Sequence, residues 1–128
     1  MKCEIISVGD ELLIGQTINT NASWLGEQLN NLGFTIAHGL VISDQKLDIV
    51  NALSQAEKRS DIVLITGGLG PTNDDITKHT LTVYFNTTLE LDKEIEQNII
   101  DYFTSRNLPI LQTNKDQALL PKSCKVLS

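Results

Sequence analysis

The chain has little cysteine and no long apolar run. Its only two cysteines, Cys3 and Cys124, lie near opposite ends of the 128 residues, and no C-x-x-C pair is present. Neither a zinc site nor a disulfide framework is therefore predicted, and both thiols are expected to be reduced. Charged residues appear early, at Glu4 and Asp10. This pattern excludes an N-terminal signal peptide and a membrane span, and a cytoplasmic location is expected.

Basic residues are also scarce. Ten lysines and arginines face 16 acidic residues, which gives a formal net charge of -6. This balance argues against nucleic acid or an anionic membrane surface as a general partner, so an anionic small ligand would need a local site. The 41% hydrophobic content is enough for the core of one domain, residues 1–128. The final "KVLS" begins like a strand without a following turn, so the domain is expected to be truncated at its C-terminal end.

The order of the apolar segments predicts alternating strands and helices. Strands are expected at residues 3–8, 34–43 and 61–66, with helices at 19–33 and 43–60 between them. In the second helix, Leu47, Val50 and Leu53 should share the buried face. The third strand is apolar throughout, which is typical of a strand covered on both faces. Further helices at 77–85 and 91–106 and a last strand at 125–128 complete the pattern. It predicts a mainly parallel sheet between helices, with ligands at the carboxyl ends of its strands.

The segment "LITGGLGPTNDD", residues 64–75, places three glycines at the end of the third strand. Without a Cβ, Gly67, Gly68 and Gly70 could turn their backbone N–H groups toward a phosphate. A tight turn with no ligand is the alternative. Two carboxylates follow, Asp74 and Asp75, and they would repel a phosphate unless a cation, most simply magnesium, lay between them. Alternatively, both aspartates lie at the start of the next helix, where its dipole favours negative charge.

The loop after the first strand, "VGDELLIGQTINTN", should reach the same sheet edge. Asp10, Glu11 and Asn19 are its candidate ligand residues. Solvated loop charges are the alternative for Asp10 and Glu11, and helix capping is the alternative for Asn19 and Asn21. The two histidines, His38 and His79, have no metal-ligand spacing.

Four segments resemble one known family in their order and spacing. They are "SVGDELLIGQTINTNASWLGEQLNNLGF", "VISD", "LITGGLGPTNDDITKHT" and "NKDQALLPKSCKVL". Together they are similar to the N-terminal domain of competence/damage-inducible protein A, the CinA family, within the wider group of molybdopterin-binding domains. The resemblance covers nearly the whole chain. It implies a three-layer α/β/α sandwich with a mainly parallel sheet, assembled as a homo-oligomer.

The resemblance implies metal-dependent hydrolysis of a nucleotide diphosphate such as ADP-ribose. On the family pattern Gly67, Gly68 and Gly70 match the phosphate-binding turn, Asp75 matches an acidic site residue, and Asp10 and Glu11 match the first-loop motif. Asp75, with Asp74 and Asp10, would then hold a divalent metal, expected to be magnesium. The chain departs from the family at position 19, where Asn19-Thr20-Asn21 replaces Asp-Thr-Asn and removes one carboxylate.

Two other functions stay open. The first is pterin-phosphate binding, as in molybdenum-cofactor biosynthesis; proline after the third glycine looks more like the CinA branch. The second is a non-catalytic nucleotide-binding module, which Asn19 makes credible. The partner expected in every case is a nucleotide or pterin phosphate.

Overall fold

A computed structural model describes residues 1–69 and 76–127 of the chain. It divides into two compact units, residues 1–69 and 70–128, and each is described by itself. The candidate residues Gly70, Asp74 and Asp75 lie outside the described part. Within residues 1–69 and 76–127, no helix is both long and apolar enough to cross a membrane.

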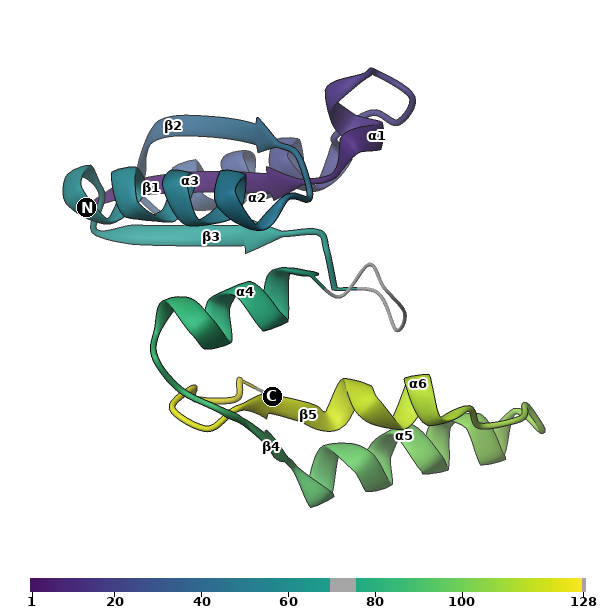
Figure 1. The fold of residues 1–128 in the computed structure, drawn as a ribbon. Coiled ribbons are helices and arrows are strands. Elements are labelled where there is room, and N and C mark those ends of the chain that lie inside the picture. The colour runs from purple at the N-terminus through teal and green to yellow at the C-terminus, as the bar shows by residue number, and fades with distance from the viewer. Residues whose placement is uncertain (70–75, 128) are drawn as a thin grey trace. The chain divides into compact units, whose positions relative to one another are not determined.

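The first unit is built on a three-stranded parallel sheet in the order β2-β1-β3 (Figure 1). The strands are β1 (Lys2–Val8), β2 (Thr35–Ile42) and β3 (Ile62–Thr66), and their helices are α1 (Asp10–Leu13), α2 (Thr20–Asn31) and α3 (Lys46–Arg59). The chain crosses from β1 to β2 through α2 and returns across β1 through α3. Because such crossovers are right-handed, the two helices cover opposite faces of the sheet (Figure 1). The predicted parallel sheet between helices is confirmed.

The core of this unit lies between β1 and α3. Strand β1 is buried from Cys3 to Val8, and α3 buries Ile49, Ala52, Leu53 and Ala56. These four positions follow the i, i+3, i+4, i+7 spacing of one helix face. The predicted buried face was confirmed at Leu53 but wrong at Leu47, which is 74% exposed. The two alanines occupy the face that meets the sheet, and their small side chains gave no apolar stripe in the sequence.

The third strand is not the most buried one. Every residue of β3 is half-buried, whereas β1 lies between two neighbours. The strand that is buried along its length is therefore β1, and not β3 as predicted. Helix α1 was also not predicted, because four residues are too few to show a helical repeat.

The second unit contains a two-stranded antiparallel sheet of β4 (Leu89–Leu91) and β5 (Leu119–Pro121). Its helices are α4 (Ile76–Tyr84), α5 (Lys93–Ser105), α6 (Gln112–Lys115) and the 3-10 helix η1 (Asp116–Ala118). Helix α5 begins where the Asp92 carboxylate accepts a hydrogen bond from Ile95 N–H at 3.1 Å. The expected strand at residues 125–128 was wrong for its described part: 125–127 have no regular structure, and the strand of this region is β5.

Candidate functional site

The order β2-β1-β3 creates a switch point at the carboxyl ends of β1 and β3. From β1 the chain continues toward β2, and β3 lies on the other side of β1. Ser7 pairs with Thr66 near these two strand ends. In open α/β sheets a crevice forms where connections leave neighbouring strands in opposite directions, and ligands bind there. The first loop and the glycine turn both start at this point.

Gly67 follows β3 directly and packs against the end of β1. Its φ of 90° lies in the left-handed region, as does the φ of 64° at Gly68. A Cβ built on Gly67 would collide with the Val8 carbonyl oxygen and lie 3.1 Å from the Val8 carbonyl carbon. No other residue fits this position without moving a strand end. Backbone packing therefore explains Gly67 by itself, and its role toward phosphate stays a prediction.

In the first loop the Glu11 carboxylate lies close to Gly9, the residue at which the loop begins. A Cβ built on the buried Gly9 would lie 2.5 Å from Glu11 Oε1 and 2.9 Å from Glu11 Cδ. The Glu11 carboxylate thus lies against Gly9, at the end of β1. Asp10 is exposed at the first position of α1. The loop backbone closes where Gln16 N–H and Thr17 N–H donate to the Glu11 carbonyl oxygen at 2.9 and 3.2 Å.

The side chain of Asn19 connects the central strand to α2. Its Oδ1 accepts a hydrogen bond from Ala22 N–H at 3.2 Å, which caps the helix. Its Nδ2 donates to Ser7 Oγ at 2.8 Å, and Ser7 is fully buried in β1. The capping alternative is confirmed for Asn19, whereas Asn21 lies inside α2. Sequence reasoning did not single out Ser7, because one serine in an apolar strand carries no signal of its partner.

These elements enclose a pocket of about 190 Å³ at the switch point. Three predicted site residues line it, namely Glu11, Asn19 and Gly67. Sequence reasoning missed other lining residues, including Thr17, Ile18 and Thr66. Thr66 could have been found as the last residue of β3, but the positions of Thr17 and Ile18 depend on how the loop folds back. Asp10 and Gly68 are not among the described residues that line the pocket.

No complete metal centre is present among residues 1–69 and 76–127, where no group of three or more His, Cys, Asp or Glu side chains could hold an ion. At the switch point, Asp10 and Glu11 supply carboxylate oxygens, the donors that Mg²⁺ prefers. Their chemistry fits a hard cation, but only Glu11 lines the pocket, and one carboxylate is too few to bind an ion alone. Asp74 and Asp75, the other predicted metal ligands, lie outside the described residues.

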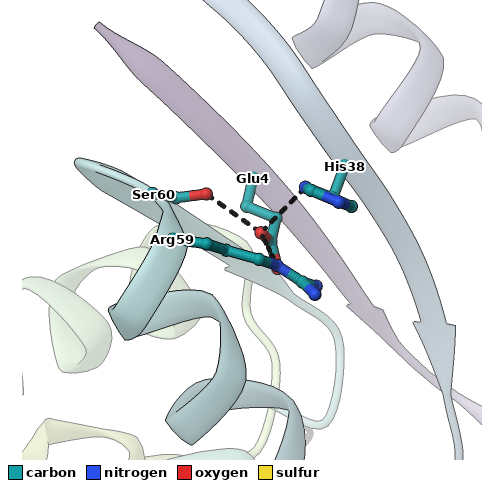
Figure 2. Close-up of polar contacts among 4 residues, drawn as sticks. All are labelled: Glu4, His38, Arg59 and Ser60. Atoms are coloured by element: carbon teal, nitrogen blue, oxygen red, sulfur yellow. Dashed lines mark hydrogen bonds and ion pairs between the residues drawn. The ribbon is translucent and has the colours of Figure 1, made fainter.

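A separate ionic cluster lies toward the amino end of β1 (Figure 2). The buried Glu4 carboxylate accepts hydrogen bonds from Arg59 Nε at 2.7 Å, Arg59 Nη2 at 2.9 Å and Ser60 Oγ at 2.9 Å. His38 Nδ1 lies 3.4 Å from Glu4 Oε1. The hydrogen bonds from Arg59 lower the pKa of Glu4 below its ordinary value of 4.5, although burial opposes this shift. The cluster connects the C-terminal end of α3 to β1 and β2. Glu4 lies about 10 Å along β1 from Ser7.

Comparison with known proteins places these features in a family. The family described as "Probable molybdopterin binding domain" matches residues 4–121. A CinA-like protein of Flavobacterium psychrophilum is 48% identical over 99% of this chain, and a putative competence-damage inducible protein of Caldicellulosiruptor bescii is 44% identical over 99%. The chain spans 31% of the length of each of these two relatives.

Solved structures agree with this assignment. The crystal structure of CinA from Thermoplasma acidophilum, a protein of unknown function, matches 97% of this chain and 72% of its own chain, with a TM-score of 0.83 and 32% identity. The tungsten cofactor synthesizing protein MoaB from Pyrococcus furiosus matches 82% of this chain and 63% of its own, with a TM-score of 0.61. At 24% identity, the second match supports the fold alone. The chain therefore belongs to the family of probable molybdopterin-binding domains and is a CinA-like member of it.

Proposed function

We propose that this chain hydrolyses a nucleotide diphosphate such as ADP-ribose with the help of a divalent metal, most simply Mg²⁺. The observation that carries the proposal is the pocket at the β1 and β3 strand ends. There the turn at Gly67, the Glu11 carboxylate and the first turn of α2 converge. A glycine turn and a helix N-terminus both offer backbone N–H groups to an anion.

In this proposal the chain's own residues divide into two groups. Gly67, Gly68 and Gly70 hold a phosphate at the end of β3, where the absence of a side chain lets the ligand approach the backbone. Asp75, with Asp74 and Asp10, holds the metal. A bound Mg²⁺ would polarise the phosphoryl group and lower the pKa of a bound water.

The reaction consumes one water. Its oxygen attacks one phosphorus of the pyrophosphate, and the bond from that phosphorus to the bridging oxygen breaks. AMP and ribose 5-phosphate leave, and the protons of the water pass to solvent. A cation would assist the departing phosphate, and Lys78 is the basic residue of the glycine-aspartate motif in the sequence. Within the second unit its Nζ donates to the Asp116 carbonyl oxygen at 3.1 Å.

The direct test is incubation of the chain with ADP-ribose and Mg²⁺, followed by detection of AMP and ribose 5-phosphate. Chelation of the metal with EDTA is the matched control. Formation of both products, lost with EDTA, is the expected result. Absence of both products over a range of protein concentrations contradicts the proposal. The same range also tests the proposal that the active form is a homo-oligomer, since specific activity then rises with concentration.

A second candidate is binding of a pterin phosphate without hydrolysis. The match of residues 4–121 to the probable molybdopterin-binding family favours it. Titration with molybdopterin in the absence of nucleotide separates the two functions, since a pterin site predicts saturable binding there and no release of AMP from ADP-ribose. Saturable ADP-ribose binding, without AMP release and without molybdopterin binding, supports a non-catalytic nucleotide-binding module instead.

A further inference from the structure

The switch-point pocket has an unusual charge for a site that serves phosphate. Among the described residues that line it, Glu11 is the one ionisable side chain. The rest of the polar lining consists of hydroxyl and amide groups, from Thr17, Asn19, Thr66 and the first turn of α2. A phosphate inside the pocket would face a carboxylate of its own sign, with no lysine or arginine among these residues to offset it. The pocket suits a neutral group that carries hydroxyls.

Glu11 is the lining residue whose side chain could bind such a ligand. Glu11 lies against Gly9, where a Cβ would come within 2.5 Å of its Oε1 atom, and Glu11 is exposed to solvent. Its two oxygens accept hydrogen bonds and donate none, so they match a pair of neighbouring hydroxyl groups. Acidic side chains bind ribose hydroxyls in this way in dinucleotide-binding folds.

We propose that the switch-point pocket is a ribose subsite, in which Glu11 accepts hydrogen bonds from the 2′ and 3′ hydroxyls of a nucleoside. The inference rests on the proposed function for its ligand class, because the phosphate joined to that ribose would lie at the neighbouring glycine turn. Gly67 belongs both to this turn and to the pocket wall, so a ribose in the pocket would have its 5′-phosphate directed to the turn. The pocket would then select ribonucleotides over deoxyribonucleotides.

The test uses adenosine and 2′-deoxyadenosine, which carry no phosphate, in buffer containing EDTA. Dissociation constants come from two-dimensional amide NMR titrations that follow the N–H signals of Gly9, Thr17 and Asn21. Wild type should bind adenosine about tenfold more tightly than 2′-deoxyadenosine. Glu11→Gln should bind the two equally, because an amide offers one acceptor oxygen where the carboxylate offers two. Glu27→Gln, which changes an exposed carboxylate on α2, should behave as wild type.

A second variant tests the position of the carboxylate and not only its presence. Gly9→Ala keeps Glu11 and an extended backbone, since the φ of Gly9 is 161°, but its methyl group displaces the carboxylate. It should also lose the preference for adenosine, while its amide spectrum remains that of a folded domain.

The inference is overturned by the lack of an adenosine-induced shift at the pocket, by equal binding of the two nucleosides by wild type, or by a preference that Glu11→Gln retains. A preference that appears only after Mg²⁺ is added also overturns it, because Glu11 then serves a cation. Failure of the inference is distinct from failure of the proposed function. If wild type releases AMP but binds adenosine and 2′-deoxyadenosine equally, only the ribose subsite is refuted. If wild type prefers adenosine but releases no AMP, only the hydrolysis is refuted.

Discussion

The amide of Asn19 lies between Ser7 of β1 and the first turn of α2. It donates to Ser7 Oγ at 2.8 Å and accepts from Ala22 N–H at 3.2 Å. Both ends of the side chain are therefore engaged inside the first unit, next to the proposed ligand pocket. Asn19, the residue that departs from the family pattern, therefore holds the start of α2 against β1.

Two replacements of Asn19 test the contribution of its two contacts to stability. Asn19→Asp should change the free energy of unfolding by less than about 1 kcal/mol, because aspartate caps helices as well as asparagine does. The Ser7 hydroxyl can then donate to the carboxylate. Asn19→Ala loses the cap and the contact to Ser7 and should cost about 2 kcal/mol. Urea unfolding of both variants checks the difference, and equal losses would contradict the capping role.

The same Asn19→Asp variant tests whether this position faces the metal. If the proposed cation lies within reach, the added carboxylate should tighten Mg²⁺ binding and raise hydrolysis about tenfold, or roughly 1.4 kcal/mol. The gain should vanish in an Asp75→Asn background. Unchanged Mg²⁺ affinity and turnover would mean that Asn19 serves only as a helix cap, and would contradict the proposal that this loop shares the metal.

Gly67 should tolerate no side chain. Gly67→Ala adds the cost of a left-handed backbone, about 1 kcal/mol, to a collision with the Val8 carbonyl oxygen. Gly15→Ala is the matched control, since Gly15 has a φ of 73° but no atom within 4 Å of the added Cβ. Thermal unfolding should show a clearly larger loss for Gly67→Ala. Equal losses would contradict the close packing of Gly67 against the Val8 carbonyl group.

The Glu4 cluster should make stability depend on pH in the acid range. Because the pKa of Glu4 is lowered in the folded state, its contribution is fully present above the unfolded value near 4.5. It is lost as the pH falls through the folded pKa. At pH 7, Glu4→Gln should cost about 2 kcal/mol, the range for hydrogen bonds to a charged group.

Unfolding of wild type and Glu4→Gln across pH 2 to 7 checks this prediction. The difference between them should shrink below about pH 4.5, the ordinary value for a glutamate. Glu27→Gln, an exposed carboxylate on α2, should show little difference at any pH. A constant gap between wild type and Glu4→Gln down to pH 2 would contradict the lowered pKa.

The parallel sheet was predictable because its signals are local. Apolar segments alternate with helical repeats, and glycines end β1 and β3, so the sequence places Gly9 and Gly67 at one sheet edge. The fit of Gly67 against Val8 was not predictable, since it depends on how closely two strand ends approach. For the same reason Ser7 was missed, because its partner Asn19 comes from another element. Strands β4 and β5 are three residues long and pair across 27 intervening residues, which leaves no periodic signal.

The role of Asp75 can be assigned by two variants, each measured for hydrolysis and for stability. Helix α4 begins at Ile76, so both the metal and the capping alternatives stay open for the residue before it. If Asp75 holds the metal, Asp75→Asn abolishes Mg²⁺-dependent hydrolysis. The free energy of unfolding then hardly changes. A helix cap predicts normal turnover and, in Asp75→Ala, a loss of about 1 kcal/mol.

The most direct measurement of the proposed function is ³¹P NMR of ADP-ribose incubated with the chain and Mg²⁺ in water enriched in ¹⁸O. The two pyrophosphate signals should be replaced by two phosphomonoester signals. One of the two products should carry the ¹⁸O label, because one water attacks one phosphorus. EDTA should stop the change. Persistence of the pyrophosphate signals with Mg²⁺ present, in protein whose amide spectrum shows a folded domain, would contradict the account.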